Sequence, residues 1–116
     1  MRRGEVYLVR FDPGEGAEIR KTRPAVIVQN DATNARSSIT IVAAITSRID
    51  DRLYPTEVLV QPPEGGLTAL SVIVLNQLRS VDKRRLGKCL GALSAETMAL
   101  VDRALIISLG LRRARR

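Results

Sequence analysis

The sequence predicts one mainly β domain, a small antiparallel barrel or sandwich with a single helix at its carboxyl end. Its 116 residues are enough for one domain and too few for a multidomain enzyme. Short apolar runs rich in β-branched residues are separated by turn-forming segments, a spacing typical of such folds. A hydrophobic share of 45% and a mean hydropathy near zero indicate a globular chain rather than a disordered one.

The first half of the chain contains three predicted strands. Residues 4–11 alternate between apolar and polar side chains, and Asp12-Pro13-Gly14-Glu15-Gly16 ends the run. A loop leads to the second strand, 24–29, with Pro24 at its start, where a missing N–H costs least. The polar segment 30–37 is expected to be a turn, and the very apolar segment 38–46 is the third strand.

The second half supplies three more strands and the helix. Strands are expected at 56–61, 71–76 and 87–93, with a turn forced by Pro62-Pro63-Glu64-Gly65-Gly66. Ser94 can cap the helix and Gly110 can end it. Its wide apolar stripe must be buried on the barrel or on a second subunit; the stripe comprises Met98, Leu100, Val101, Ala104, Leu105, Ile107 and Leu109.

The composition excludes several kinds of site. A single cysteine permits neither an intramolecular disulfide nor a thiolate metal cluster, and we expect Cys89 to be a buried structural thiol. The absence of histidine removes the usual zinc sites and the Ser/His and Cys/His types of nucleophilic catalysis. No stretch resembles a signal peptide or a membrane span, so we expect a cytoplasmic protein.

The charge predicts a polyanionic or acidic partner. Nineteen basic against twelve acidic side chains give a net charge of +7 and a pI near 10.7. More than half of that charge comes from four arginines at the end, so we divide the chain into a domain at 1–111 and a basic tail at 112–116. The tail is either a solvated end or a contact for nucleic acid.

Polar side chains at predicted strand ends are the candidates for chemistry. Arg23 lies where the first loop meets the second strand, and its planar guanidinium suits a phosphate. Thr46 and Ser47 end the third strand and could meet the same anion, although strand-end hydroxyls can also be purely structural. Asn76, Gln77 and Arg79 follow another strand and could read base edges, whereas the basic residues after them could equally form a solvated face.

These residues belong to a pattern that resembles the toxins of the MazF/PemK type. The resemblance covers residues 2 to about 111 in order, and three of its segments are distinctive: Lys21-Thr22-Arg23-Pro24-Ala25-Val26-Ile27-Val28-Gln29-Asn30-Asp31, Ile45-Thr46-Ser47 and Asn76-Gln77-Leu78-Arg79-Ser80-Val81-Asp82. It implies an SH3-like antiparallel barrel that forms a homodimer. It also implies a metal-independent, sequence-specific endoribonuclease without a cofactor, which cuts single-stranded RNA and is bound by an acidic antitoxin.

The same resemblance assigns the site. The catalytic arginine and threonine of the family fall on Arg23 and Thr46. The positions that contact RNA fall on Asn30, Ser47, Tyr54, Asn76 and Gln77, with Arg79 close by.

One departure concerns the general base. Many members have a carboxylate where this chain has Asn76, and some have a histidine where it has Ala17. An amide cannot take the proton of the 2′-hydroxyl, so the candidate base is Glu18 in the first loop, and the alternatives are a water molecule or positioning of the substrate without a base. The alternative function is that of the CcdB-type toxins, which bind and poison DNA gyrase without cutting RNA.

Overall fold

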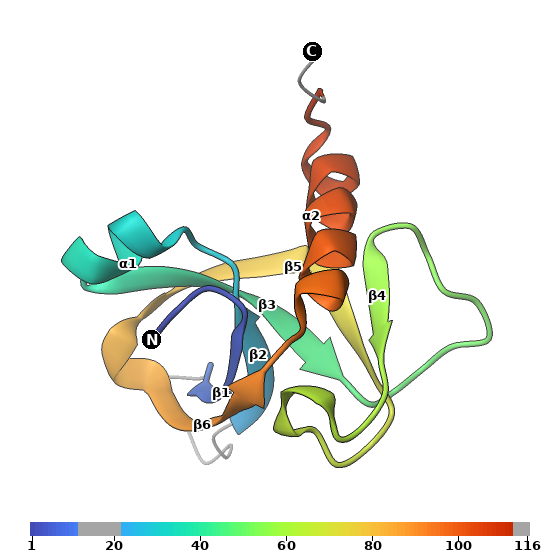
Figure 1. Cartoon of the computed structure of the whole chain (residues 1–116), viewed down its shortest axis with the longest axis horizontal. Helices are drawn as coiled ribbons and strands as arrows, with labels where there is room; N and C mark the ends of the chain where they lie inside the picture. Colours follow the sequence, from blue (N-terminus) through green and yellow to red (C-terminus); the bar gives the residue numbers. More distant parts are fainter. Residues whose placement is uncertain (12–21, 113–116) are drawn as a thin grey trace.

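The computed structural model describes residues 1–11 and 22–112, and Figure 1 shows a curled antiparallel sheet with two helices packed beside it. The sheet has six strands in the order β4-β5-β3-β2-β1-β6. The elements are β1 (Glu5–Arg10), β2 (Thr22–Ile27), α1 (Asp31–Arg36), β3 (Ile39–Thr46), β4 (Glu57–Val60), the 3-10 turn η1 (Glu64–Gly66), β5 (Ser71–Asp82), the 3-10 turn η2 (Lys83–Arg85), β6 (Leu86–Ala92) and α2 (Ala95–Leu109). The predicted mainly β fold with a carboxyl-terminal helix is confirmed.

The central strands are buried on both faces, which explains their nearly continuous apolar sequences. On β2, Val26 packs into the larger core with α2 and β4, whereas its neighbours Ala25 and Ile27 face a second cluster. On β3, Ala43 packs into the larger core and Val42 packs into the second cluster. Because successive side chains of a strand point to opposite faces, a curled sheet that encloses two clusters requires apolar residues at every position.

The predicted small antiparallel barrel is open, because the sheet of the described residues does not close on itself. Among the described residues no strand pairing joins the two edge strands, β4 and β6. The turn η1, which follows β4, packs against β6 instead. At Gly66, where φ is +73°, a Cβ atom would lie only 1.9 Å from the carbonyl oxygen of Leu90, so glycine is required for this close approach.

Strand β5 is longer than predicted, because Asn76 and Gln77 form a bulge rather than an end. Ala43 of β3 pairs with Leu78, but Ala44 pairs with Val74, so residues 75–77 have no partner on β3. Both Asn76 and Gln77 are exposed there. A bulge bends and twists a strand, which allows β5 to pair with β4 at one end and with β3 along its length.

Both helices have capped ends. The segment 30–37, expected to be a turn, contains the short helix α1, whose N-terminus is capped by the Asn30 side chain accepting from the backbone N–H of Thr33 at 2.8 Å. In α2 the predicted caps are confirmed: Ser94 accepts from the N–H of Thr97, and Gly110 adopts the left-handed conformation. Glu64 of η1 accepts from the N–H of Ser94 at 2.9 Å, and this bond lowers the pKa of that carboxyl.

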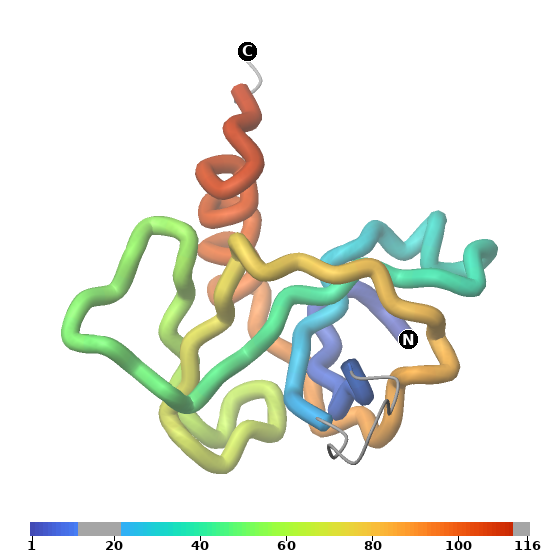
Figure 2. The backbone as a smooth tube through the Cα atoms, turned by 180° about the vertical axis from the view of Figure 1, so that it is seen from behind, coloured from blue at the N-terminus to red at the C-terminus, as the bar shows by residue number. Residues whose placement is uncertain are grey.

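The apolar stripe of α2 is only partly covered. Val101 and Ala104 are buried in the larger core, but Leu100 and Ile107 are each 50% exposed, and Leu109 is exposed as well. Figure 2 shows from behind that the end of α2 leads away from the sheet. This helix has 15 residues, and no helix of the described chain has the length and apolar character needed to cross a bilayer.

The expectation of a buried cysteine is wrong. Cys89 lies on β6 and is exposed. Strand β6 lies at the edge of the sheet, so apolar neighbours in the sequence do not ensure that the Cys89 side chain is buried.

Candidate active site

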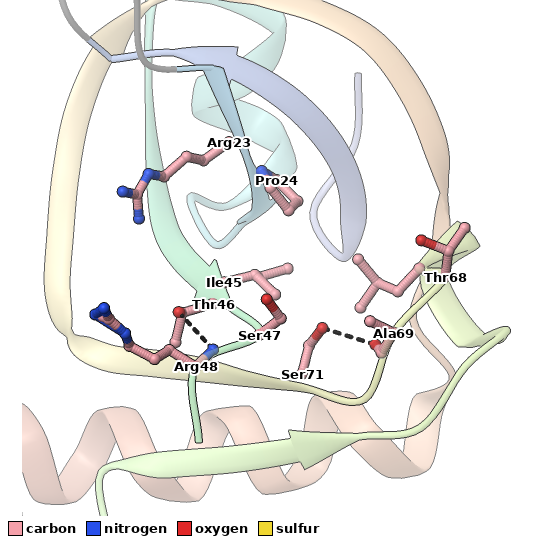
Figure 3. A pocket seen from close by; sticks show the side chains of 10 residues that line it. Arg23, Pro24, Ile45, Thr46, Ser47, Arg48, Thr68, Ala69 and Ser71 are labelled. Carbon is pink, nitrogen blue, oxygen red and sulfur yellow. Dashed lines mark hydrogen bonds between the residues drawn. The ribbon is translucent and has the colours of Figure 1, made fainter. Parts of the chain in front are cut away.

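A cleft of about 700 Å³ opens at the end of the sheet where β2 begins and β3 ends. One wall comes from these two strands and the residues after Thr46, and the opposite wall comes from the segment between η1 and β5 (Figure 3). The lining residues are Arg23, Pro24, Ile45, Thr46, Ser47, Arg48, Leu67, Thr68, Ala69 and Ser71. Among them are two arginines and four hydroxyl groups, and no carboxylate.

The strand register explains why Arg23 and Thr46 meet here. The pairing of β2 with β3 ends at Ala25 opposite Ala44, and Arg23 and Thr46 each lie two residues beyond that pair. A step of two along a strand keeps the side chain on the same face, so both side chains belong to one face of the sheet. Each is held by a different neighbour: Arg23 pairs with Val9 of β1, and Thr46 pairs with Val72 of β5.

The two strands part at this point, and the cleft fills the space between them. Pro24 lies just beyond the last β2–β3 pair, and proline cannot donate to a ladder. In β2 it is the third residue rather than the first, because β2 begins at Thr22 and continues its pairing with β1. The proline therefore marks the end of the pairing with β3 and the beginning of the cleft.

The hydroxyl of Thr46 has a defined orientation. The backbone N–H of Arg48 donates to Thr46 Oγ1 at 3.0 Å (Figure 3). With one lone pair engaged in this way, the hydroxyl proton is left to be donated to an oxygen atom in the cleft. On the opposite wall the Ser71 hydroxyl already donates to the carbonyl oxygen of Ala69 at 2.8 Å.

This arrangement is suited to an anion. The positive charge of the two arginines attracts a phosphate, and a guanidinium with a hydroxyl donor on the same wall can hydrogen-bond two of its oxygens. Chemically, the same pair can stabilise negative charge that develops on a phosphorus centre. Among the described residues, no group of three or more histidine, cysteine or acidic side chains could hold a metal ion.

Comparisons with known proteins identify the family of this chain. The family model of the PemK-like, MazF-like toxins of type II toxin-antitoxin systems matches residues 2–109. The chain belongs to this toxin family. The toxin is similar to an endoribonuclease from a mycobacterial species, solved with its cognate antitoxin, with 27% identity over 98% of this chain and 99% of that one at a TM-score of 0.80.

Two solved structures from Deinococcus radiodurans are similar as well. A MazF structure is 28% identical to the toxin over 96% of this chain and 97% of that chain, with a TM-score of 0.77. A MazE–MazF complex is 27% identical over 97% of both chains, with a TM-score of 0.79. The similarity therefore extends over nearly the whole length of each protein.

Of the residues predicted from the toxin's sequence, Arg23, Thr46 and Ser47 line the cleft together. Five others do not line it: Asn30, Tyr54, Asn76, Gln77 and Arg79. Glu18 and most of the first loop lie outside the described residues.

Three of the residues outside the cleft have other partners. The side chain of Asn30 caps α1. The Arg52 guanidinium lies 5.9 Å from the ring centroid of Tyr54, and that of Arg79 lies 5.0 Å from the ring centroid of Phe11. These are stacking contacts at exposed or partly exposed positions.

Sequence reasoning missed three polar lining residues: Arg48, Thr68 and Ser71. The spacing could have identified Arg48, because it lies two residues after Thr46, as residues that share a face of an extended chain do. Thr68 and Ser71 carry no such signal, since their place opposite Thr46 depends on how the segment after η1 folds back.

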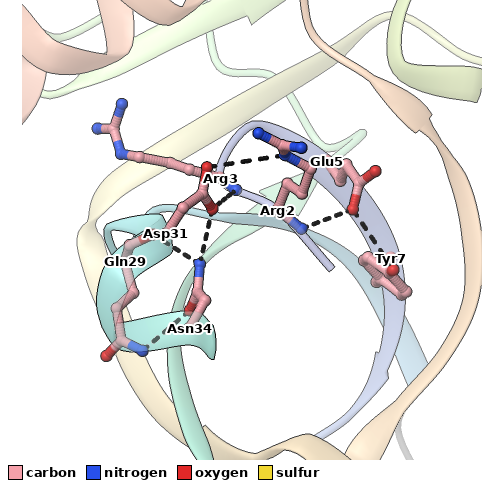
Figure 4. Close-up of polar contacts among 7 residues, drawn as sticks. All are labelled: Arg2, Arg3, Glu5, Tyr7, Gln29, Asp31 and Asn34. Atoms are coloured by element: carbon pink, nitrogen blue, oxygen red, sulfur yellow. Dashed lines mark hydrogen bonds and ion pairs between the residues drawn. The ribbon is translucent and has the colours of Figure 1, made fainter. Parts of the chain in front are cut away.

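A polar network anchors α1 and the N-terminus of the toxin (Figure 4). The backbone N–H of Arg3 donates to Asp31 Oδ1 at 2.7 Å, and this bond, with the amide of Asn34 and the charge of Arg2, lowers the pKa of Asp31. The Arg3 side chain donates to the carbonyl of Val28 and forms an ion pair with Asp102 of α2 at 2.7 Å. Arg3 therefore joins α1, α2 and the end of β2.

Two further groups outside the cleft have shifted pKa values. Burial, and then the nearby Glu5 and Cys89, raises the pKa of Tyr7 to about 12. The side chain and backbone N–H of Arg84 lower the pKa of Asp82 and hold that carboxylate at the start of η2.

Proposed function

We propose that this toxin is a sequence-specific endoribonuclease that cuts single-stranded RNA, chiefly mRNA, without a metal ion, and so inhibits translation and growth. One observation carries the proposal: Arg23 and Thr46 lie on one wall of a cleft, and the described residues that line it include no carboxylate. The similarity to an endoribonuclease that is 27% identical supports the same reaction.

The reaction proposed is an attack by the RNA on itself. The 2′-oxygen bonds to the adjacent phosphorus, the bond from phosphorus to the 5′-oxygen breaks, and the products are a 2′,3′-cyclic phosphate and a 5′-hydroxyl. One proton leaves the 2′-hydroxyl and one is taken up by the departing 5′-oxygen. No water, metal or cofactor enters this balance.

Arg23 and Thr46 divide the work on the phosphate. Arg23 stabilises the extra negative charge on the pentacoordinate phosphorus, an effect worth about 3 to 4 kcal/mol for a well-placed donor. It is a poor proton donor because a guanidinium keeps its proton in proteins. Thr46 donates its hydroxyl proton to a non-bridging oxygen, the direction left open by its bond from Arg48 N–H.

The general base is assigned to Glu18, since Asn76 cannot accept the proton of the 2′-hydroxyl. Asn76 and Gln77 are exposed on the bulge of β5, so they remain available to contact bases together with Asn30, Ser47, Tyr54 and Arg79.

The proposed partners are an acidic antitoxin and a second copy of the chain. The net charge of +7 favours an acidic segment, and two similar structures contain an antitoxin. The exposed leucines of α2 and β4 border a groove of about 260 Å³ that a second copy would cover. Because the substrate is mRNA, we place the activity in the cytoplasm.

The test is to incubate the purified protein with a long RNA in EDTA and to map the new 5′ ends. We expect discrete cuts that carry 5′-hydroxyl groups. Arg23→Ala should lower the cleavage rate at least about 100-fold while leaving the unfolding midpoint unchanged.

Arg36→Ala is the matched control, since it also removes one exposed positive charge but lies on α1 outside the cleft. Its cleavage rate should stay near that of the wild type. Unchanged cutting by Arg23→Ala would exclude its catalytic role. Intact RNA together with inhibited DNA gyrase would instead support the CcdB-type function.

A further inference from the structure

We propose that Arg48 forms a second phosphate subsite, which binds the phosphate next to the scissile one on the same RNA strand. The inference rests on the proposed ribonuclease function and adds a residue to it. It starts from the position of Arg48 on the same wall of the cleft as Arg23 and Thr46.

The geometry places Arg48 beside the reacting phosphate rather than on it. Figure 3 shows the guanidinium groups of Arg23 and Arg48 extending to the same side of the cleft, with the Thr46 hydroxyl beside the Arg48 side chain. Since the backbone N–H of Arg48 is bonded to Thr46 Oγ1, the start of the Arg48 side chain has a fixed position relative to the Thr46 hydroxyl. Two guanidinium groups and one hydroxyl donor thus line the same cleft.

The charges favour two phosphates over one. Each linkage of an RNA strand carries one negative charge, so a strand that passes through the cleft brings a second charge next to the first. In the part of the chain that the structure describes, Arg48 forms no ion pair, and no carboxylate lines the cleft. Its positive charge is therefore available to an anion, and its planar fork is suited to two phosphate oxygens.

A single lost contact of this kind has a defined signature. A charge-assisted hydrogen bond is worth about 1.5 to 3 kcal/mol, which corresponds to a loss of roughly tenfold or more in affinity. Each phosphate contact to a single strand contributes about 0.7 to the slope of log affinity against log salt concentration. Removing Arg48 should lower both the affinity for RNA and the salt slope, and the cut site should not change.

The experiment uses short RNAs centred on the mapped cut site, with 2′-deoxyribose at the cut nucleotide so that they bind but cannot be cleaved. In a series of these RNAs, one linkage at a time near the cut is made a neutral methylphosphonate. Affinities for the full-length wild type and for Arg48→Gln are measured by fluorescence anisotropy. Arg36→Gln, an exposed arginine outside the cleft, is the matched control variant.

We expect one linkage adjacent to the cut whose neutralisation weakens wild-type and Arg36→Gln binding about tenfold. For Arg48→Gln, neutralising that linkage should not weaken binding, because the contact to this phosphate is already lost. Arg48→Lys should recover part of the affinity, because it restores the charge without the fork. The salt slope of Arg48→Gln should be smaller by about 0.7.

Two other outcomes overturn the inference in different ways. If every neutral linkage weakens the wild type and Arg48→Gln by the same factor, Arg48 binds no particular phosphate, although the ribonuclease function stands. If the wild type neither cuts RNA nor binds the uncleavable RNA, the proposed function fails, and the subsite fails with it.

Discussion

The hydroxyl of Thr46 combines two hydrogen-bonding roles in one atom. It accepts from the N–H of Arg48 within the protein, and its proton is left for the substrate. A serine can perform both roles, whereas a valine of the same shape can perform neither. Substitutions at this position therefore separate the chemistry of the hydroxyl from the packing of the side chain.

We predict that Thr46→Val lowers the single-turnover cleavage rate roughly 100-fold, the effect of removing one donor to a developing negative charge. Thr46→Ser should stay within about tenfold of the wild type, since it keeps the hydroxyl. The rates are measured at saturating enzyme with a labelled RNA, and circular dichroism melts check the fold. Retained activity in Thr46→Val, together with a loss in Thr46→Ser, would assign Thr46 a packing role instead.

At the residue scale, local pattern predicted part of the cleft. Arg23, Thr46 and Ser47 could be selected because each stands at a predicted strand end, and strand ends gather at one edge of a sheet. Cys89 was predicted wrongly, because an apolar sequence neighbourhood does not reveal that β6 is an edge strand. The roles of Asn76, Gln77 and Tyr54 stay predictions.

Among the elements, η1 has the strictest requirement for its sequence. Gly65 and Gly66 both have positive φ, and the backbone of Gly66 lies directly against the Leu90 carbonyl of β6. Through this contact the connection after β4 reaches the opposite edge strand of the sheet. Gly110 has nearly the same φ, +67°, but no atom lies within 4 Å of the place its Cβ would take.

We predict that Gly66→Ala lowers the free energy of unfolding by about 3 kcal/mol, because the left-handed strain adds to a backbone collision. Gly110→Ala should lower it by only about 1 kcal/mol, since it adds the conformational strain alone. Urea unfolding followed by circular dichroism measures both. Similar losses in the two variants would show that the contact between η1 and β6 contributes little.

At this scale the regular elements were predictable and the irregular ones were not. The caps of α2 are encoded by Ser94 and Gly110 themselves, so both of its ends were predicted correctly. Asn76 and Gln77 are polar residues in the middle of a strand, and only the bulge opposite β3 explains them. The six residues of α1 are too few for a periodic pattern, and Asn30 reads equally as a turn residue or as a cap.

The whole molecule leaves an apolar surface along α2 and β4. Leu53, Leu59 and Leu100 border one groove there, and Leu100 is half exposed. Isolated exposed leucines are ordinary, but a cluster of them on one face is typical of a surface that binds a protein. The proposed homodimer would bury this face.

We predict that the wild type sediments as a dimer at micromolar concentration and that Leu100→Glu sediments as a monomer, because the dimer would have to remove a carboxylate from water in the covered groove. Ile39→Glu is the control, since Ile39 is similarly exposed on β3 but lies outside the groove. Analytical ultracentrifugation gives the answer. A monomeric wild type would remove the dimer from the proposed function.

The sequence by itself determined the class of fold, the order of strands and helix, the family, and which polar side chains could carry the chemistry. The fold class and the elements depend on local patterns, since apolar spacing, caps and turn residues act over a few positions. The family and its candidate residues follow from the resemblance of the motifs along the chain. Only the tertiary structure decided that β2 and β3 part after Ala25 and Ala44, that Arg48 joins Arg23 beside Thr46, and that η1 reaches β6. These contacts join residues that are far apart in the chain, and they form only when the bulged sheet curls.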